Sequence, residues 1–388
     1  MHQMNHYLHR LFQKNITDLY IMHTVRNFAF SLVSIFIPIY FLQQGFSIFE
    51  VGWYIASFYL LLIPSSYIGM KLAAKTGIKK AFWVSLPISL LFIISLNYLL
   101  QIQIILGTLF TILIIATLQA LNSSIYWMSY HIEFTKFSSK KKGAKQLGLT
   151  QVFSVMAGIA APLIGAVTIA QFSYPLVFAT VATLLIIAFI PMIFSKDDHE
   201  PFEFKIQKLT TKRLKDYVLP YFAEGLYNPA TSFFWPIMLF FLFTSLPKMG
   251  GLYMASNFLH AAVMYFVSFH LTEKNRFKLL LFGTIMHGAS LVARIFVKTI
   301  GAAFAIQSFG GFSGPFFVIP FHNLYYNKAK KEKKAEHIYF REVYLNLGRF
   351  STAALLIIML FLFEPIIALS IMLVFSAIAL QGLNLIKK

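Results

Sequence analysis

Long apolar runs, separated by short polar breaks, are the feature that most constrains what this chain can fold into. A run of about 20 apolar residues is long enough to cross the hydrocarbon core of a bilayer as a helix, and such runs recur along the whole chain. Of the 388 residues, 58% are hydrophobic and only 12% are charged, whereas soluble domains carry about 25% charged residues. A soluble fold of this size could not hide so many runs from water. The sequence therefore predicts an all-α integral membrane protein.

The apolar runs predict twelve membrane-spanning helices. The first six fall near residues 19–43, 49–74, 80–99, 103–130, 145–171 and 174–194. The second six fall near residues 217–244, 250–271, 277–297, 300–326, 338–362 and 364–386.

The net charge of +19 is distributed unevenly among the connections between these helices. If alternate connections share a side, 27 of the 33 Lys and Arg residues face one side, and only Lys248 and Lys298 face the other. The excess is the positive-inside pattern. It predicts a multi-pass protein of the cytoplasmic (inner) membrane with both termini in the cytoplasm. Because topology explains the basic charge, we expect no nucleic-acid partner.

Motifs for enzymatic or cofactor chemistry are not found in the sequence. There is no cysteine, which excludes disulfides and cysteine-based metal sites. The glycine-rich stretch 308–317 lacks the Lys-Ser or Lys-Thr of a phosphate loop and lies inside a predicted span. His131 and His322 are interpreted as residues at helix ends rather than as a metal pair. We expect no enzyme activity, no cofactor and no bound metal, and the N-terminus does not resemble a removable signal peptide.

Two halves of the chain repeat each other. "SIFIPIYF" at 34–41 aligns with "SFFWPIML" at 232–239, an offset of 198. "YIAS" at 54–57 aligns with "YMAS" at 253–256, an offset of 199. The near-constant offset predicts two pseudo-symmetric six-helix bundles, 1–194 and 217–388, joined by a cytoplasmic linker at 195–216. Transporters built from parallel repeats bind their solute between the halves, near the middle of the membrane.

This architecture resembles the major facilitator superfamily. That family carries a loop between its second and third helices with a Gly, an acid, a second Gly and several basic residues. The corresponding stretch here, "GMKLAAKTGIKK" at 69–80, has Ala74 in place of the acid. The resemblance implies a gating loop that helps to latch the two halves on the cytoplasmic side. Its matching positions are Lys75, Gly77, Lys79 and Lys80.

The fifth predicted helix carries a second resemblance. "AGIAAPLIGA" at 157–166 is similar to the Gly-Pro-x-x-Gly-Gly signature of proton-coupled drug exporters, with alanine replacing two glycines. Pro162 and Gly165 are the matching positions. Small residues and proline allow helices to pack closely and to bend. The resemblance implies export, and ordinary close packing is the alternative.

Charged and polar residues inside the membrane are costly and indicate function. In the eleventh span, Glu342, Asn346 and Arg349 are spaced i, i+4 and i+7 and share one face. An arginine near the middle of a span would cost several kcal/mol if it faced lipid, so this face is predicted to point inward. Arg349 would serve a cavity or gate, or a structural ion pair. Arg341, nearer the helix end, could instead extend to the headgroups.

The repeat pairs two further charges. The offset of 198 places Arg26 in helix 1 opposite Glu224 in helix 7, and the resemblance implies that both helices line a central cavity. We predict that the two side chains attract each other across the halves and close the cytoplasmic side, with a structural salt bridge as the alternative. Glu224 is then the best candidate for a titrating carboxylate, and Asn228 continues its face.

Other polar side chains fit a site for a partly apolar solute, although interhelical packing would use the same residues. They are Gln119, Asn122 and Tyr126 in the fourth helix and Asn257 in the eighth. Arg294, near the outer end of the ninth helix, is predicted to be an interfacial anchor.

The sequence therefore predicts a secondary transporter that works by alternating access. The favoured function is proton-coupled efflux of a small, partly hydrophobic molecule. The alternatives are uptake or exchange of an anionic solute held by Arg26 or Arg349, and a transport-inactive receptor of the same fold. The expected partners are a small-molecule solute, protons and the lipid bilayer, and we expect a monomer.

Overall fold

The computed structural model describes residues 14–137, 156, 158–194, 202–206, 214–331 and 334–386, and every regular element within them is helical. The first group of α-helices comprises α2 (Lys14–Ser31), α3 (Ile37–Gln43), α4 (Ile48–Thr76), α5 (Ile78–Asn97), α6 (Leu99–Leu106), α7 (Thr108–Phe137), α9 (Ala161–Gln171) and α10 (Tyr174–Phe194). The second comprises α11 (Val218–Pro229), α12 (Trp235–Phe243), α13 (Leu246–His270), α14 (Arg276–Ala293), α15 (Ile300–Lys331), α16 (Lys334–Leu362) and α17 (Pro365–Leu380).

Eleven helical segments among the described residues are long and apolar enough to cross a membrane. Of the remaining predicted span, 145–171, residues 145–155 and 157 lie outside the described residues, and α9 forms its last part. The predicted start of the fourth span at 103 is wrong. Gly107 has φ of +79° and ends the short helix α6, so α7 begins at Thr108. A positive φ is readily adopted only by glycine.

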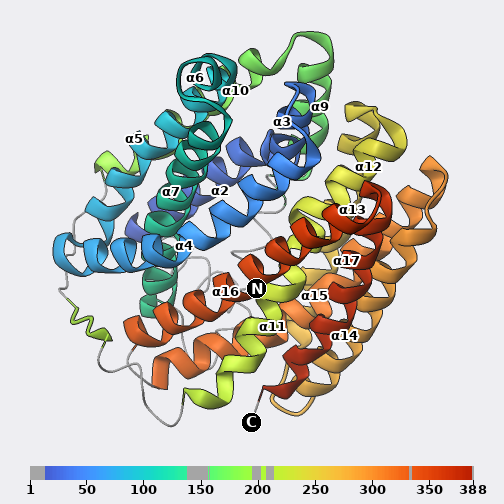
Figure 1. Cartoon of the computed structure of the whole chain (residues 1–388). Helices are drawn as coiled ribbons and strands as arrows, with labels where there is room; N and C mark the ends of the chain where they lie inside the picture. The colour runs from blue at the N-terminus through green and yellow to red at the C-terminus, as the bar shows by residue number, and fades with distance from the viewer. Residues whose placement is uncertain are drawn as a thin grey trace.

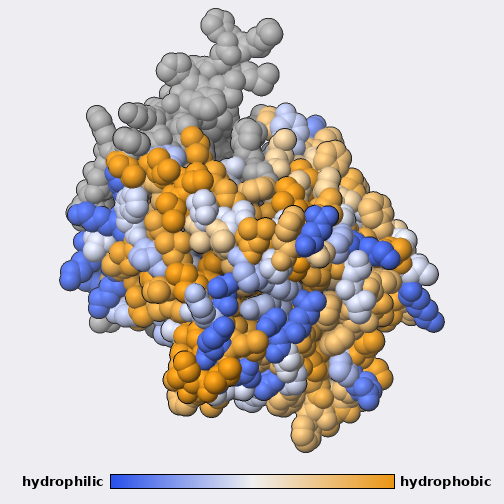
Figure 2. All heavy atoms as spheres, turned by 90° about the horizontal axis from the view of Figure 1, so that it is seen from above, coloured by the Kyte–Doolittle hydropathy of each residue, from blue (hydrophilic) through white to orange (hydrophobic). Residues whose placement is uncertain are grey.

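Apolar side chains cover much of the outer surface. Ile104, Phe361 and Ile378 are 83%, 80% and 69% exposed. In Figure 2 hydrophobic residues dominate the face in view, and hydrophilic residues gather in separate patches. Such a surface suits lipid, because in water large exposed apolar patches are rare on monomeric proteins.

The helices form two pseudo-symmetric groups that pack against each other. Figure 1 shows α2–α10, blue to green, on one side and α11–α17, yellow to red, on the other. The two most extensive contacts between the groups are those of α4 along α16 and of α9 along α13. In each of these two contacts, the second span of one half packs against the fifth span of the other half: α4 and α13 are second spans, and α9 and α16 belong to fifth spans. The two contacts are therefore related by the same pseudo-symmetry as the halves. The boundaries at 194 and 217 stay a prediction, because most of the linker lies outside the described residues.

Glycines bring particular helices into backbone contact. A Cβ on Gly225 of α11 would lie 2.1 Å from the carbonyl oxygen of Leu345, and one on Gly348 of α16 would lie 2.2 Å from that of Phe222. Between the halves, a Cβ on Gly250 would lie 2.7 Å from the carbonyl oxygen of Pro162. Only glycine permits such approaches. The α11–α16 contact places Glu224 directly beside α16.

The first and seventh spans are interrupted at matching positions. A 3₁₀ segment, Ser34–Phe36, precedes α3, and a π-helical segment, Ala230–Phe234, separates α11 from α12. Pro38 and Pro236 follow in the first turns of α3 and α12. Proline has no N–H and so removes the helical hydrogen bond to the residue four before it, here Ser34 and Ser232. These residues are related by the same offset of 198 as the sequence repeat.

Candidate functional site

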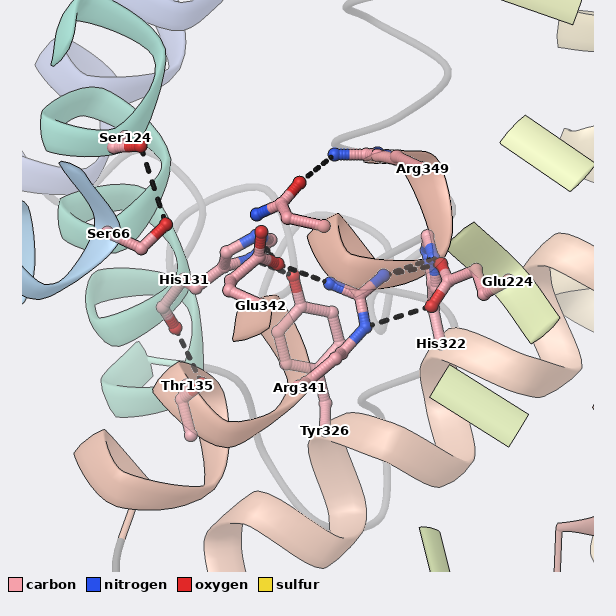
Figure 3. A network of polar contacts seen from close by, with 11 residues as sticks. Ser66, Ser124, His131, Thr135, Glu224, His322, Tyr326, Arg341, Glu342 and Arg349 are labelled. Atoms are coloured by element: carbon pink, nitrogen blue, oxygen red, sulfur yellow. Dashed lines mark hydrogen bonds and ion pairs between the residues drawn. The ribbon is translucent and has the colours of Figure 1, made fainter. Parts of the chain in front are cut away.

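Arg341 of α16 holds two buried carboxylates together (Figure 3). Its Nε donates to Oε2 of Glu224 at 3.1 Å, and its Nη2 donates to Oε1 at 2.5 Å. Its Nη1 donates to Oε1 of Glu342 at 2.7 Å. All three side chains are buried. Charge-assisted and bidentate bonds of this kind are the strongest in proteins.

Two histidines extend this network toward the other half of the molecule. His322 of α15 lies with Nε2 3.2 Å from Glu224 Oε1. His131 belongs to α7, in the first helix group, and its Nδ1 lies 2.7 Å from the hydroxyl of Tyr326. The Nε2 of His131 lies 3.8 Å from Glu342 Oε1. The network therefore crosses the interface between the two groups.

A cavity of about 190 Å³ lies between the groups, next to Glu342. Helices from both groups line it. Its walls are Phe58, Tyr59, Leu62 and Ser66 of α4; Ser123, Ser124, Trp127 and Met128 of α7; Asn228, Ser232 and Phe233 of the seventh span; and Glu342 and Arg349 of α16. Aromatic rings and hydroxyls share this wall with two charged groups, so the cavity suits a small amphipathic solute.

Arg349 lines this cavity without a carboxylate partner in the described part of the chain. Its Nη1 donates to Oδ1 of Asn346 at 3.0 Å, and its guanidinium carbon lies 5.6 Å from the ring centroid of Tyr59. Its Nε is buried and has no acceptor. The side chain is half-buried. Its charge is therefore available to a bound solute.

The predicted pairing of Arg26 with Glu224 is wrong. Arg26 is buried within its own half, where Nη2 donates to Oδ1 of Asn122 at 3.1 Å and the guanidinium carbon lies 3.5 Å from the ring centroid of Tyr126. Glu224 is already paired with Arg341, because Gly225 and Gly348 bring α11 and α16 together. The repeat correctly relates the two positions but does not make them touch.

The structure also contradicts the headgroup alternative for Arg341 and the anchor prediction for Arg294. Arg341 does not extend toward headgroups, because its partners hold it buried at 4% exposure. Arg294 is not an interfacial anchor: it is 3% exposed and lies over Trp235, with 5.0 Å between the guanidinium carbon and the ring centroid.

The remaining predicted site residues lie apart from the cavity, except Asn228. Gln119 accepts a hydrogen bond from the Tyr54 hydroxyl, within one half. Asn257 Nδ2 donates to the carbonyl of Gly158 at 3.4 Å, across the α9–α13 side. Gly77, at φ +96°, joins α4 to α5, and Lys75 and Lys80 are exposed beside it. Lys79 is half-buried in the same connection. We call this end of the molecule the basic end.

Pro162 and Gly165 of α9 lie at two close helix contacts. A Cβ on Gly165 would lie 1.9 Å from the carbonyl oxygen of Leu32, and the carbonyl of Pro162 faces Gly250. The first contact is within a half, and the second is between halves.

Sequence reasoning missed the α4 wall of the cavity. Phe58, Leu62 and Ser66 are spaced i, i+4 and i+8 and so share a helical face. The hydroxyl of Ser66 on this otherwise apolar face could have indicated a cavity wall. His131 was interpreted only as a residue at a helix end, and its partner Tyr326 was not considered.

Two apolar helix groups around a polar cavity define a membrane transporter of the two-bundle type. A family model described as Major Facilitator Superfamily matches residues 19–385. The chain belongs to the major facilitator superfamily, whose members are transporters and not enzymes.

Individual relatives are distant in sequence. The uncharacterized protein YqgE of Bacillus subtilis (strain 168) is 22% identical over 334 residues, covering 82% of this chain and 76% of that protein. The E. coli fucose:proton symporter FucP superposes with a TM-score of 0.66 at 13% identity, covering 96% of this chain and 97% of that one. The human organic anion transporter MFSD10 (TETRAN) superposes with a TM-score of 0.60 at 11% identity, covering 97% and 99%. The two superpositions show a shared fold.

Proposed function

We propose that this protein is a proton-coupled secondary transporter that exports a small, partly hydrophobic organic anion. The observation that carries the proposal is Arg349: a cation in the inter-half cavity that hydrogen-bonds to the amide of Asn346 and, within the described part of the chain, forms no ion pair, although Glu342 also lines the cavity. Even for a half-buried cation, the absence of an ion-pair partner is unfavourable. A solute carboxylate would supply that partner, while Phe58, Tyr59 and Phe233 contact its apolar part. The sequence analysis treated a partly hydrophobic solute and an anionic solute as separate hypotheses. The proposal combines both properties in one solute.

The network around Arg341 is the proposed proton site. It contains two carboxylates, Glu224 and Glu342, and a single arginine. These three side chains together carry one excess negative charge. Because uncompensated charge inside a protein is costly, one proton taken up by a carboxylate or histidine would neutralise the network. Glu342 borders both the network and the cavity, so protonation and solute binding would influence each other.

Direction and orientation rest on sequence features. The pattern around Pro162 and Gly165 is similar to that of exporters, and the basic end is proposed to be cytoplasmic, with both termini on that side and the chain in the inner membrane. The halves are proposed to comprise 1–194 and 217–388. FucP is named as a proton symporter and MFSD10 as an organic anion transporter, so the fold accommodates both proposed partners.

A thermal-unfolding screen in detergent tests the solute class. Purified protein would be mixed with a matched series of aromatic carboxylates, their amides and aromatic amines. We expect carboxylates alone to raise Tm, and Arg349→Gln to abolish the rise. Stabilisation by the amides or amines that persists in Arg349→Gln would contradict the anionic assignment.

Proteoliposomes test coupling and direction. With a carboxylate from that screen, an imposed pH gradient should drive solute against its concentration gradient in the native protein but not in Glu224→Gln. Basic-end-out vesicles should accumulate solute when their lumen is acidic. Accumulation only when the medium outside the vesicles is the more acidic side would indicate symport with protons and would overturn export in favour of uptake.

A further inference from the structure

Arg294 is a buried arginine that does not line the cavity. Arg294 begins a 3₁₀ turn, Arg294–Phe296, at the end of α14 opposite the basic end. Helices α12, α13 and α15 surround it with Trp235, Tyr253 and Gln307. Arg294, Trp235 and Gln307 are 3%, 0% and 6% exposed, so water cannot solvate the guanidinium.

No carboxylate among the described residues pairs with this charge. Two acidic residues lie toward the same end of the helices. Glu50 accepts from the Ser47 amide at 2.7 Å, where it caps α4. Glu364 is exposed before α17. Arg294 is therefore a buried cation whose own chain, where described, supplies no counter-charge.

Most of the N–H groups of Arg294 have no hydrogen-bond acceptor among the described residues. Among the described residues, the acceptor that Arg294 bonds is Gln307 Oε1, at 3.5 Å from Nη2, and that oxygen also accepts from Trp235 Nε1 at 2.8 Å. Buried atoms of three side chains have no partner: Arg294 Nε and Nη1, Ser290 Oγ and the Tyr253 hydroxyl. Almost all buried polar atoms in proteins are hydrogen-bonded. Unsatisfied donors next to an unpaired cation indicate an anion as the missing acceptor.

The absence of a side chain at Gly310 brings the α15 backbone close to the same groups. A Cβ on Gly310 of α15 would lie 3.0 Å from Arg294 Nη2 and 3.2 Å from Ser290 Oγ. A side chain there would press on both polar groups. Gly310 thus leaves the guanidinium and the serine hydroxyl facing the same point.

We propose that Arg294, with Ser290 and Tyr253, forms a second anion site inside the C-terminal half, for a halide-sized monovalent ion such as chloride. The enclosed surroundings favour a monatomic ion over an organic carboxylate, which would need room for its apolar part. The ion would neutralise Arg294 and satisfy the free donors. None of these three residues lines the solute cavity that contains Arg349. The proposed anion site and the proposed solute site can therefore be tested independently.

Anion titrations at constant ionic strength test this site. Purified protein in gluconate would be titrated with chloride, and Tm recorded. We expect a saturable rise in Tm for the native protein and for Arg349→Gln, at least tenfold weaker chloride affinity for Gly310→Ala, and no saturable rise for Arg294→Gln. No saturable rise in the native protein, or a rise retained in Arg294→Gln, would overturn the proposal.

Bromide quenching of tryptophan fluorescence gives a readout independent of stability, because bromide bound beside Arg294 would lie near the Trp235 ring. A saturable component of quenching should be present in the native protein and absent from both Trp235→Phe and Arg294→Gln. Quenching that stays linear with bromide in every variant would contradict the site. A Tm rise produced through Arg294 by benzoate but not by chloride would also reject the halide assignment.

Discussion

Arg341 is the residue on which the buried network depends, since it binds Glu224 and Glu342 at once. Removing one partner of a buried ion pair costs about 3–5 kcal/mol, because the other charge is left uncompensated. We therefore expect Arg341→Gln to lower the free energy of unfolding by about that amount. The double variant Arg341→Gln/Glu224→Gln should recover part of the loss, since one stranded carboxylate is then neutral. Thermal unfolding of the native, single and double variants in one detergent measures this coupling. Additive losses would show that the pair does not interact energetically.

Gly348 permits the α11–α16 contact that holds Glu224 beside Arg341. Its Cβ would meet the backbone of Phe222 at 2.2 Å, so Gly348→Ala must push the helices apart. We expect a loss of about 1–3 kcal/mol, as for other overpacked interiors, measured as a fall in Tm. Gly251→Ala is the matched control, because nothing lies within 4 Å of its Cβ. Equal Tm values for the two variants would mean that the contact is not tight.

At the residue scale, the sequence predicted which side chains face inward but not their partners. Helical spacing placed Glu342, Asn346 and Arg349 on one face, and in the structure Glu342 and Arg349 line the cavity. The Arg26–Glu224 pairing failed because the repeat relates positions and says nothing about distances. Which carboxylate meets which arginine is decided by glycine contacts between α11 and α16, and a single sequence does not show which helices will pack together.

At the element scale, periodicity and hydropathy predicted most spans to within a few residues, because lipid requires every spanning segment to be an apolar helix. Interruptions of the helix inside a span were harder to predict from the sequence. The aligned "SIFIPIYF" and "SFFWPIML" contained the prolines, but proline also occurs inside continuous helices here, such as Pro64 of α4. The surroundings decide whether the helix continues.

The break in the seventh span is expected to act during transport. Pro236 follows the π-helical segment and denies Ser232 a helical partner, so α12 can change its angle to α11. Pro236→Ala restores a backbone N–H that can donate to the carbonyl of Ser232. We expect unchanged or higher Tm with at least tenfold slower solute flux in proteoliposomes. The control is Pro191→Ala in the continuous helix α10. A flux equal to that of the native protein would show that the break has no part in the rate-limiting movement.

At the scale of the whole molecule, the two halves meet at the basic end as well as around the cavity. There, the ring of Phe134 on α7 lies 4.6 Å from that of Tyr326 on α15, centroid to centroid. Near the cavity, Tyr59 of α4 and Phe233 of the seventh span have centroids 5.8 Å apart. Transport by alternating access requires the contacts at the basic end to open while the halves stay folded.

The absence of cysteine makes this movement directly measurable. We expect Phe134→Cys/Tyr326→Cys to be joined efficiently by a short bifunctional thiol reagent in the resting protein, and several-fold less when solute and a pH gradient are present. The matched control is Trp83→Cys/Phe189→Cys, which links α5 to α10 within one half, where the rings lie 5.7 Å apart. Cross-linking of this control should not change, because each half moves as a unit. If cross-linking of both pairs decreases equally, the packing within a half also changes, and the halves do not move as rigid units. If neither responds although the solute binds, the halves do not alternate, and the protein is a receptor of this fold rather than a transporter.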